Sequence, residues 1–310
     1  MYRRRKKFLF SLIIILLGIN HLNAFFPVRI NRIFNRNKIT QGVNEIKILS
    51  FNVRAFNIYE WYSNPSTSKA IVNLIRSENP DVICLQEFLT SPRANYKPEN
   101  VLSLFSNLPY HFIHYTFNYG VNAGYGIATF SRYPIIKEGI LDFKKTINES
   151  IYTDLQIAGD TIRVYNNHLQ SVKFQQRNYA FLDTLRLKYD EENLREILDI
   201  SVKLKTAYIK RAEQVDSISA HINNCPHPVI VCGDFNDTPV SYAYRKLTRG
   251  LKDAFITTGK GLGNTYLGIF PSFRIDYILH SLDFVPLIFE KVNVELSDHY
   301  PIICILDLKK

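Results

Sequence analysis

Short apolar segments that end abruptly in carboxylate or amide side chains constrain this chain more than any other feature. In the segment VIVCGDFND, residues 229–237, an apolar run ends in Asp234 and Asn236. Side chains alternate along a strand, so Asp234 and Asn236 share the face opposite Val231. Burying a carboxylate beside an amide at the end of a core strand costs free energy unless a cation or an anionic substrate compensates for it. The segment therefore predicts a ligand site at a strand end.

The same design recurs along the chain and predicts an α/β domain. Helical spacing of apolar residues predicts a helix over 66–76, which Pro80 ends. Helical spacing also runs through the second half of the stretch 173–222, whereas the aromatic-rich segment 174–198 fits either a surface helix or a flap over the substrate site. Strands are expected at 45–53, 81–88, 124–135, 161–169, 227–235, 274–280 and 301–308.

Charge is distributed unevenly along the 310 residues. The formal net charge is +10, but residues 1–38 hold nine Lys or Arg and no Asp or Glu. The remaining residues carry 29 basic and 28 acidic groups, a net charge of +1. A nearly neutral body is weak support for nucleic-acid binding. We expect one catalytic domain over residues 45–310, after a polar and basic linker at 27–44.

The first 26 residues have the pattern of a signal peptide or a membrane anchor. A basic start precedes the apolar run Phe8–Ile19, and the small residue Ala24 follows it. Twelve apolar residues fall short of the roughly 20 that span a bilayer, so cleavage and retention both remain open. We expect a protein that is exported or inner-membrane-anchored, with its catalytic domain outside the cytoplasm.

Three of the four cysteines lie inside apolar strand-like runs. Cys84, Cys232 and Cys304 have no spacing typical of a zinc site or of a disulfide framework. A free cysteine in such a run behaves as a small apolar side chain. We therefore expect these thiols to be packed in the core.

Strand ends gather at one edge of a packed sheet, which would bring these polar residues together. Carboxylates that lie close to one another require a proton, a histidinium or a metal ion. Carboxylate and amide oxygens suit Mg²⁺ or Mn²⁺, whereas zinc would favour more His or Cys. The expected cluster contains four carboxylates, two amides and two histidines: Glu87, Asp234, Asp276, Asp298, Asn52, Asn236, His168 and His299.

Six motifs in the order of the chain resemble those of the endonuclease/exonuclease/phosphatase superfamily of metal-dependent phosphoesterases. They are SFNVRAFN, LQEF, NNHLQS, GDFND, RIDYIL and SDHYPI, and they extend over about residues 45–308. The resemblance implies a four-layer α/β sandwich, in which two packed mixed β-sheets are flanked by helices and the site lies at one edge.

The resemblance also implies a role for each polar residue at the metal. Glu87 would bind the divalent ion, Asn52 would lie beside it, and Asp298 would be a further ligand. The metal would neutralise the phosphate and the departing oxygen.

For the catalytic residues, the resemblance implies that Asp234 orients and deprotonates the attacking water. Asn236 and His168 would donate hydrogen bonds to non-bridging phosphoryl oxygens. His299 would act as acid/base or phosphate ligand, oriented by Asp276. We interpret Arg274 as part of a structural ion pair more than as a phosphate clamp.

The function expected from these residues is metal-dependent hydrolysis of a phosphodiester or phosphomonoester by in-line attack of water. Nucleic acid, a phospholipid and a small phosphodiester remain open as substrates. Two alternatives stay beside this hypothesis: an extracellular nuclease specifically, and an inactive binding protein on the same fold. The leader predicts the membrane as a partner, and no obligate protein partner is evident.

Overall fold

The computed structural model covers the region expected to form the catalytic domain. The described residues are 45–57, 67–91, 103–120, 123–143, 146–183, 191–268 and 273–309, together with single residues at 18, 25 and 27. The predicted leader (1–26) and linker (27–44) therefore lie outside the described residues, apart from those three positions. Within the described ranges, every helix is too short or too polar to cross a membrane.

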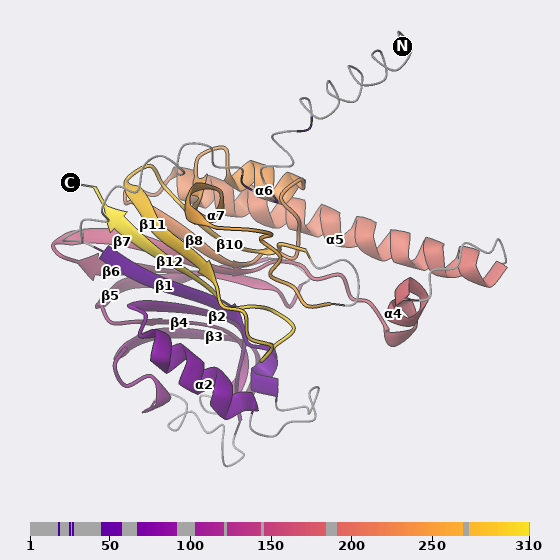
Figure 1. Ribbon diagram of the computed structural model, residues 1–310, viewed down its shortest axis with the longest axis horizontal. Coiled ribbons are helices and arrows are strands. Elements are labelled where there is room, and N and C mark those ends of the chain that lie inside the picture. The colour runs from indigo at the N-terminus through magenta and orange to yellow at the C-terminus, as the bar shows by residue number, and fades with distance from the viewer. Residues whose placement is uncertain are drawn as a thin grey trace, which may run out of the picture.

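Two six-stranded sheets pack face to face (Figure 1). In spatial order the first sheet contains β11 (Phe284–Lys291), β12 (Ile302–Leu308), β1 (Glu45–Asn52), β2 (Val82–Thr90), β4 (Ala123–Ser131) and β3 (Tyr110–Gly120). The second contains β5 (Ile135–Leu141), β6 (Glu149–Ile157), β7 (Asp160–His168), β8 (Val229–Asp234), β10 (Asp276–His280) and β9 (Lys252–Asp253). Both sheets are mixed, because β1 and β2 are parallel, β7 and β8 are parallel, and the other pairs are antiparallel.

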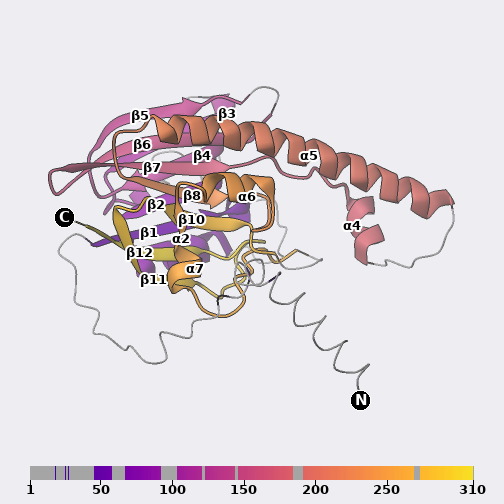
Figure 2. The same ribbon diagram turned by 90° about the horizontal axis from the view of Figure 1, so that it is seen from above.

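Helices cover the outer face of each sheet, which completes the four layers (Figures 1 and 2). Helix α2 (Thr67–Glu78) buries Ile71 and Ile75 against the first sheet. Helix α5 (Glu191–Asn223) buries Val215 and Ile218 against the second, where α6 (Tyr242–Leu247) lies beside it. The short elements are η1 (Arg54–Asn57), α4 (Gln176–Asp183) and α7 (Ala254–Thr258). The expected four-layer α/β sandwich is confirmed.

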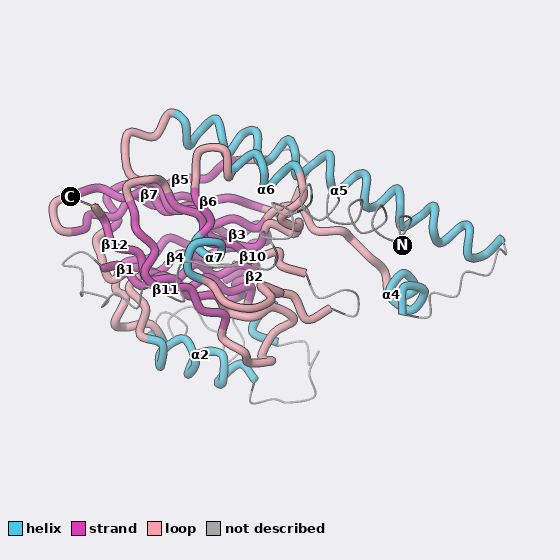
Figure 3. The backbone as a smooth tube through the Cα atoms, turned by 45° about the horizontal axis from the view of Figure 1, so that its top comes forward, coloured by secondary structure: helices cyan, strands magenta, loops and turns pink. Residues whose placement is uncertain are grey.

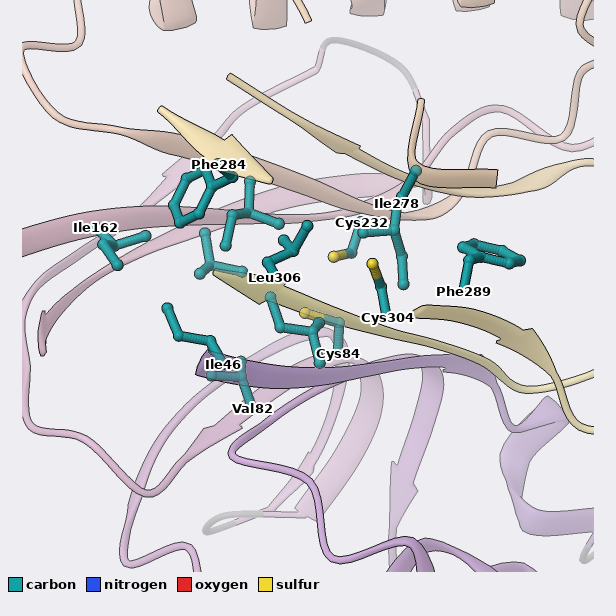
Figure 4. Packing of buried hydrophobic residues seen from close by; sticks show 14 of the residues in the cluster. Ile46, Val82, Cys84, Ile162, Cys232, Ile278, Phe284, Phe289, Cys304 and Leu306 are labelled. Carbon is teal, nitrogen blue, oxygen red and sulfur yellow. The ribbon is translucent and has the colours of Figure 1, made fainter. Parts of the chain in front are cut away.

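The space between the sheets is filled with aliphatic side chains and three thiols. Cys84 comes from the first sheet and Cys232 from the second, and both are fully buried together with Cys304 (Figure 4). Burial raises the pKa of the Cys232 and Cys304 thiols, so they stay protonated and apolar. The expected burial of these cysteines is confirmed.

The expected helix at 66–76 is present as α2, which ends two residues before Pro80. The stretch 173–222 is more regular than expected. Its second half belongs to the 33-residue helix α5, which continues back to Glu191 and projects beyond the sheets with α4 beside its free end (Figure 3). The segment 174–198 therefore contains α4 and the first turns of α5.

The single strand expected at 124–135 is wrong. Strand β4 ends at Ser131, and β5 begins at Ile135 in the other sheet. Pro134 has no N–H to donate to a ladder, so the chain leaves one sheet and enters the other around it. No strand was expected at the positions of β3, β6, β9 and β11.

Candidate active site

All eight predicted site residues meet where the two sheets end on the same side of the molecule. Six of them line a pocket of about 480 Å³: Glu87, His168, Asp234, Asn236, Asp298 and His299. The other two lie directly behind it. Asn52 donates a hydrogen bond to Asp234, and Asp276 accepts one from His299. The convergence expected from the strand ends is therefore present.

Three neighbouring strands of the second sheet place His168, Asp234 and Asp276 level with one another. Asp234 is paired in register with His168 of β7 and with Asp276 of β10. Gly233 makes this close approach feasible, because its φ is +128° and an added Cβ would lie 2.0 Å from the Asn167 carbonyl oxygen. The glycine of the GDFND motif is thus required by the backbone.

Asp234 is 1% exposed, and its hydrogen-bond donors are neutral amides. Its Oδ1 accepts a hydrogen bond from the Asn236 backbone N–H at 2.7 Å, and its Oδ2 accepts from Asn236 Nδ2 at 3.1 Å and Asn52 Nδ2 at 3.2 Å. Within the described residues it forms no ion pair with a lysine or an arginine. Burial raises the pKa of Asp234 to about 6, against the opposing effect of His299. The carboxylate is therefore poised to exchange a proton near neutral pH.

His299 lies between two carboxylates. Its Nδ1 donates to Asp276 Oδ2 at 2.9 Å, and its Nε2 lies 3.7 Å from Asp234 Oδ2. Burial opposes a charge on the ring, but Asp276 and Asp234 outweigh it and hold the pKa of His299 well above its usual value. The predicted pairing of His299 with Asp276 is present, and it fixes the orientation of the ring.

His168 approaches the same carboxylate from β7. Its Nε2 lies 3.7 Å from Asp234 Oδ2 and 3.9 Å from Glu87 Oε1. Burial lowers the pKa of His168, which favours the neutral imidazole. The two histidines therefore differ: His299 is cationic, and His168 is a neutral hydrogen-bonding group.

Glu87 reaches the pocket because β2 contains a bulge. The pairing of β2 with β4 shifts between Leu85 and Phe88, and Glu87 has a φ of +50°. A bulge redirects a side chain, and here it separates Glu87 from Gln86, which donates to Asn166 between the sheets. The strand expected at 81–88 is present as β2, which continues to Thr90.

The carboxylate of Glu87 accepts hydrogen bonds from Asn52 Nδ2 at 3.3 Å and from the Tyr125 hydroxyl. Burial and the nearby Asp298 raise the pKa of Glu87. Arg54 Nε lies 3.4 Å from Asp298 Oδ2, so one cation already faces that side. Two neighbouring carboxylates with an amide beside them fit a hard divalent cation.

A second group of potential ligand atoms lies deeper. Atoms of Asp234, Asp276 and His299 all lie within 4.8 Å of one another. A metal at this position would bind His299 through Nε2, because Nδ1 is bonded to Asp276. The oxygen donors at Glu87 and Asp298 are the other candidate position for a cation, and they are the ones predicted from the sequence.

One wall of the pocket is apolar, and part of it comes from the segment 174–198, for which two interpretations were open. Phe174 precedes α4, and Tyr179 and Leu182 belong to α4, whereas Leu204 and Tyr208 of α5 lie beyond this segment. These contacts favour the interpretation of the stretch as a cover of the site over that of an ordinary surface helix.

Arg54, Tyr125 and Tyr266 also belong to the site, and sequence reasoning missed them. No motif marks Tyr125, because its position depends on the pairing of β4 with β2. Tyr266 lines the pocket from a loop, with its ring 5.1 Å from that of His299. Arg54 is the exception, since it sits inside the SFNVRAFN motif and could have been inspected there.

Arg274 does not face the pocket. Its guanidinium bonds Asp253 Oδ2 at 2.6 Å and is packed against the rings of Phe255 and Tyr277. Both partners of this ion pair are almost fully buried. The expected structural role of Arg274 is confirmed.

The family model of the Endonuclease/Exonuclease/phosphatase family matches residues 49–299, and the chain belongs to this family. Membership of this family identifies the protein as a hydrolase of the phosphoesterase or nuclease type. Among curated proteins, none matches the chain.

Solved structures with this fold include an endonuclease/exonuclease/phosphatase from Bacteroides vulgatus, which is 19% identical, with 86% of this chain and 99% of that chain covered and a TM-score of 0.63. The human Nocturnin catalytic domain with bound sulfate is 17% identical, with coverage of 86% and 95% and a TM-score of 0.58. Danio rerio TDP2 complexed with a single-strand DNA product is 17% identical, with coverage of 85% and 99% and a TM-score of 0.56. At these identities the likeness concerns the fold.

Proposed function

We propose that this protein is a Mg²⁺- or Mn²⁺-dependent phosphoesterase that hydrolyses a phosphodiester or phosphomonoester by in-line attack of water. The observation that carries the proposal is the row Asp234–His299–Asp276, buried at the base of a pocket whose rim holds Glu87 and Asp298. A base, an oriented imidazolium and a pair of metal-binding carboxylates are the groups that phosphoester hydrolysis needs.

Asp234 orients the attacking water and accepts its proton. With a pKa of about 6, it is mostly ionised at neutral pH and still basic enough to take a proton in the transition state. Asn236 and Asn52 donate to Asp234, and these bonds hold its orientation.

His299 and His168 stabilise the charge that develops on the phosphoryl oxygens. His299 presents a cationic ring held by Asp276, and His168 presents a neutral N–H. Asn236 adds a third donor when a substrate replaces its bond to the Leu169 carbonyl oxygen. These donors lie where negative charge increases during the reaction, so they stabilise the transition state more than the bound substrate and thereby raise the rate.

Glu87 would hold the divalent cation, with Asn52 beside it and Asp298 as a further ligand. When bound, the ion supplies positive charge to the phosphate and to the leaving oxygen. Tyr125 keeps the Glu87 carboxylate in place through its hydroxyl.

We also propose that the leader directs this activity outside the cytoplasm. Residues 1–26 act as a signal peptide or a membrane anchor, and residues 45–310 form the catalytic domain after the linker. The support is the basic start followed by an apolar run.

Nucleic acid is a second candidate substrate, and its support is a fold neighbour solved with a single-strand DNA product. Binding to DNA releases counterions, so its affinity would fall steeply with salt. A salt titration of binding therefore separates this candidate from a small phosphodiester, which carries a single negative charge on its phosphate.

Purified full-length protein in mild detergent is the material for the test. Plasmid DNA, phospholipids and a generic bis-phosphodiester are each incubated with Mg²⁺, with Mn²⁺ and with EDTA. We expect hydrolysis of at least one phosphoester that EDTA abolishes and added metal restores. Absence of hydrolysis with either metal, or hydrolysis that persists in EDTA, contradicts the proposal.

A further inference from the structure

Two short turns carry residues of the site out of the second sheet. Strand β7 ends at His168, and β8 ends at Asp234. One more backbone hydrogen bond, from the Leu169 N–H to the Asp234 carbonyl oxygen at 2.9 Å, continues their pairing. The residues that follow, Gln170 in one turn and Asn236 in the other, belong to neither strand. Their positions therefore depend on other hydrogen bonds.

Arg211 of α5 binds both turns. Its Nη1 donates to the Gln170 carbonyl oxygen at 2.8 Å, and its Nε donates to Asp237 Oδ2 at 3.0 Å. Gln214, three residues further along the helix, accepts a hydrogen bond from the Gln170 N–H through its Oε1 at 2.9 Å. Both backbone polar groups of Gln170 are therefore bonded to α5, and so is the second aspartate of the GDFND motif.

A further bond connects the two turns to each other. Asn236 Nδ2 donates to the Leu169 carbonyl oxygen at 2.9 Å, directly after His168 in the chain. Asp237, which Arg211 binds, is the residue next to Asn236. Hydrogen bonds and peptide bonds thus form a closed ring that joins α5 to both turns. A displacement of the Arg211 guanidinium would therefore move His168 and Asn236 together.

The Arg211 side chain lies in the wall of the pocket but is closed off from a substrate. It is 2% exposed, and its Cζ lies 4.6 Å from the centroid of the Tyr208 ring. A guanidinium is planar and directs several donors at fixed angles, whereas a lysine ammonium is a compact point charge. The planar group fits two acceptors on separate turns.

A second buried arginine–aspartate pair provides an internal comparison. Arg163 of β7 binds Asp154 of β6 at 2.6 and 2.7 Å, and its guanidinium also packs on a tyrosine ring, that of Tyr152. This pair joins strands that the sheet already pairs, and neither of its members lines the pocket. Buried ion pairs stabilise a fold no more than apolar residues of the same volume. Stability alone therefore does not explain a buried pair at Arg211.

We propose that Arg211 is a positioning residue of the active site, which holds the turns of His168 and Asn236 where their donors meet the phosphoryl group. Arg211 acts through these two residues and does not touch the substrate. Asp237 and Gln214 complete the attachment of the turns to α5. This inference rests on the phosphoesterase function proposed above.

Arg211→Lys keeps the charge but replaces the planar group, and Arg163→Lys makes the same change in the comparison pair. Both full-length variants are assayed with Mg²⁺ and the panel phosphoester that the wild-type protein hydrolyses fastest. We expect kcat of Arg211→Lys to fall about 10–100-fold, because misplacing catalytic groups by about 1 Å has an effect of this size. Its KM should change by less than about threefold. For Arg163→Lys, urea unfolding should show a loss of stability, whereas kcat is retained. Equal kcat values of the two variants overturn the proposal.

A double-mutant cycle tests whether Arg211 acts through His168. In the background His168→Ala, the loss of kcat caused by Arg211→Lys should be smaller by about threefold or more, because one of the groups that Arg211 positions is gone. The same loss in both backgrounds overturns the positioning role. A rise of about tenfold or more in the inhibition constant of inorganic phosphate would make Arg211 a substrate-binding residue, which also overturns it.

NMR of protein labelled with ¹⁵N-histidine gives a readout without turnover. The ring signals of His168, identified by their loss in His168→Ala, should shift in Arg211→Lys and stay in place in Arg163→Lys. If the wild-type protein hydrolyses no phosphoester of the panel, the proposed function fails, and these spectra still decide whether Arg211 holds His168. Unshifted His168 signals in Arg211→Lys overturn the inference.

Asp237→Asn is the second variant, for the case that Arg211→Lys does not fold. It keeps the volume of the side chain but removes the charge that Arg211 Nε binds. We expect the same pattern at smaller size: kcat should fall about 3–30-fold, with shifted His168 ring signals. Unchanged kcat and unchanged His168 signals in Asp237→Asn contradict the proposed attachment.

Discussion

The middle and the end of the same strands are buried to the same extent but have opposite chemistry. In β8 and β10, Cys232 and Ile278 are fully buried among aliphatic side chains, whereas Asp234 and Asp276 are 1% and 2% exposed. In the middle, burial itself stabilises the fold. At the ends, burial destabilises charge, and the protein tolerates it where a ligand must bind.

Buried carboxylates elsewhere show what a structural role requires. Asp154 is 2% exposed, but Arg163 binds both of its oxygens, at 2.6 and 2.7 Å. Asp253 likewise has an arginine partner, since its Oδ2 accepts a hydrogen bond from Arg274 Nη1 at 2.6 Å. Asp234 has amides and imidazoles around it but no such cation in the described part of the chain. The partner, and not the depth of burial, separates a structural carboxylate from a catalytic one.

Asp234→Asn provides the strongest test of this contrast. It removes the base, so kcat should fall by about 10²–10⁴-fold while the free energy of unfolding is unchanged or increased. The matched variant Asp154→Asn should lower the free energy of unfolding and leave kcat unchanged, because it leaves the Arg163 guanidinium buried without its carboxylate partner. Steady-state kinetics and urea unfolding measure both. Near-normal turnover in Asp234→Asn would remove it as the base.

Ile278→Ala tests the middle of the strands. Ile278 is fully buried between the sheets, so its truncation should lower the free energy of unfolding by about 2–5 kcal/mol. The kcat of the folded fraction should be retained. Ile136→Ala, at a position 55% exposed on β5, is the control and should cost less than about 1 kcal/mol. Equal losses for both variants in chemical denaturation would contradict the assignment of the core.

Glu87→Gln tests the rim of the site. It removes one metal-binding charge, so the Mg²⁺ concentration for half-maximal activity should rise about 10–100-fold. Calorimetric titration of Mn²⁺ into the protein without substrate measures the affinity for the metal independently of turnover. An unchanged metal titration would count against Glu87 as a ligand.

The pH dependence follows from the raised pKa of Asp234. The base must be ionised, so kcat/KM should fall about tenfold per pH unit below about 6 and reach a plateau near neutrality. The free energy of unfolding changes with pH in the opposite direction to kcat/KM. The folded protein binds the Asp234 proton more tightly than the unfolded chain does, so stability falls as pH rises from about 4 to about 6. Asp234→Asn should remove that part of the stability profile. A flat rate profile across this range would contradict the pKa.

Much of the site could be predicted because its residues are marked by local context. Asp234 follows an apolar run and Gly233, and Asp298 and His299 precede the apolar run of β12, so each stands out in a short window of sequence. Tyr125 has no such mark, since it contributes to the site only through the pairing of β4 with β2. The bulge at Glu87 was missed for the same reason: it exists only as a mismatch between two strands.

The sequence by itself determined the class of fold and the chemistry at the strand ends, because alternation and composition act over a few neighbouring residues. The tertiary structure alone decided which groups meet. Register placed His168, Asp234 and Asp276 side by side, and packing left the first half of α5 without a sheet beneath it. Those outcomes depend on contacts between residues far apart in the chain, and no local pattern encodes them.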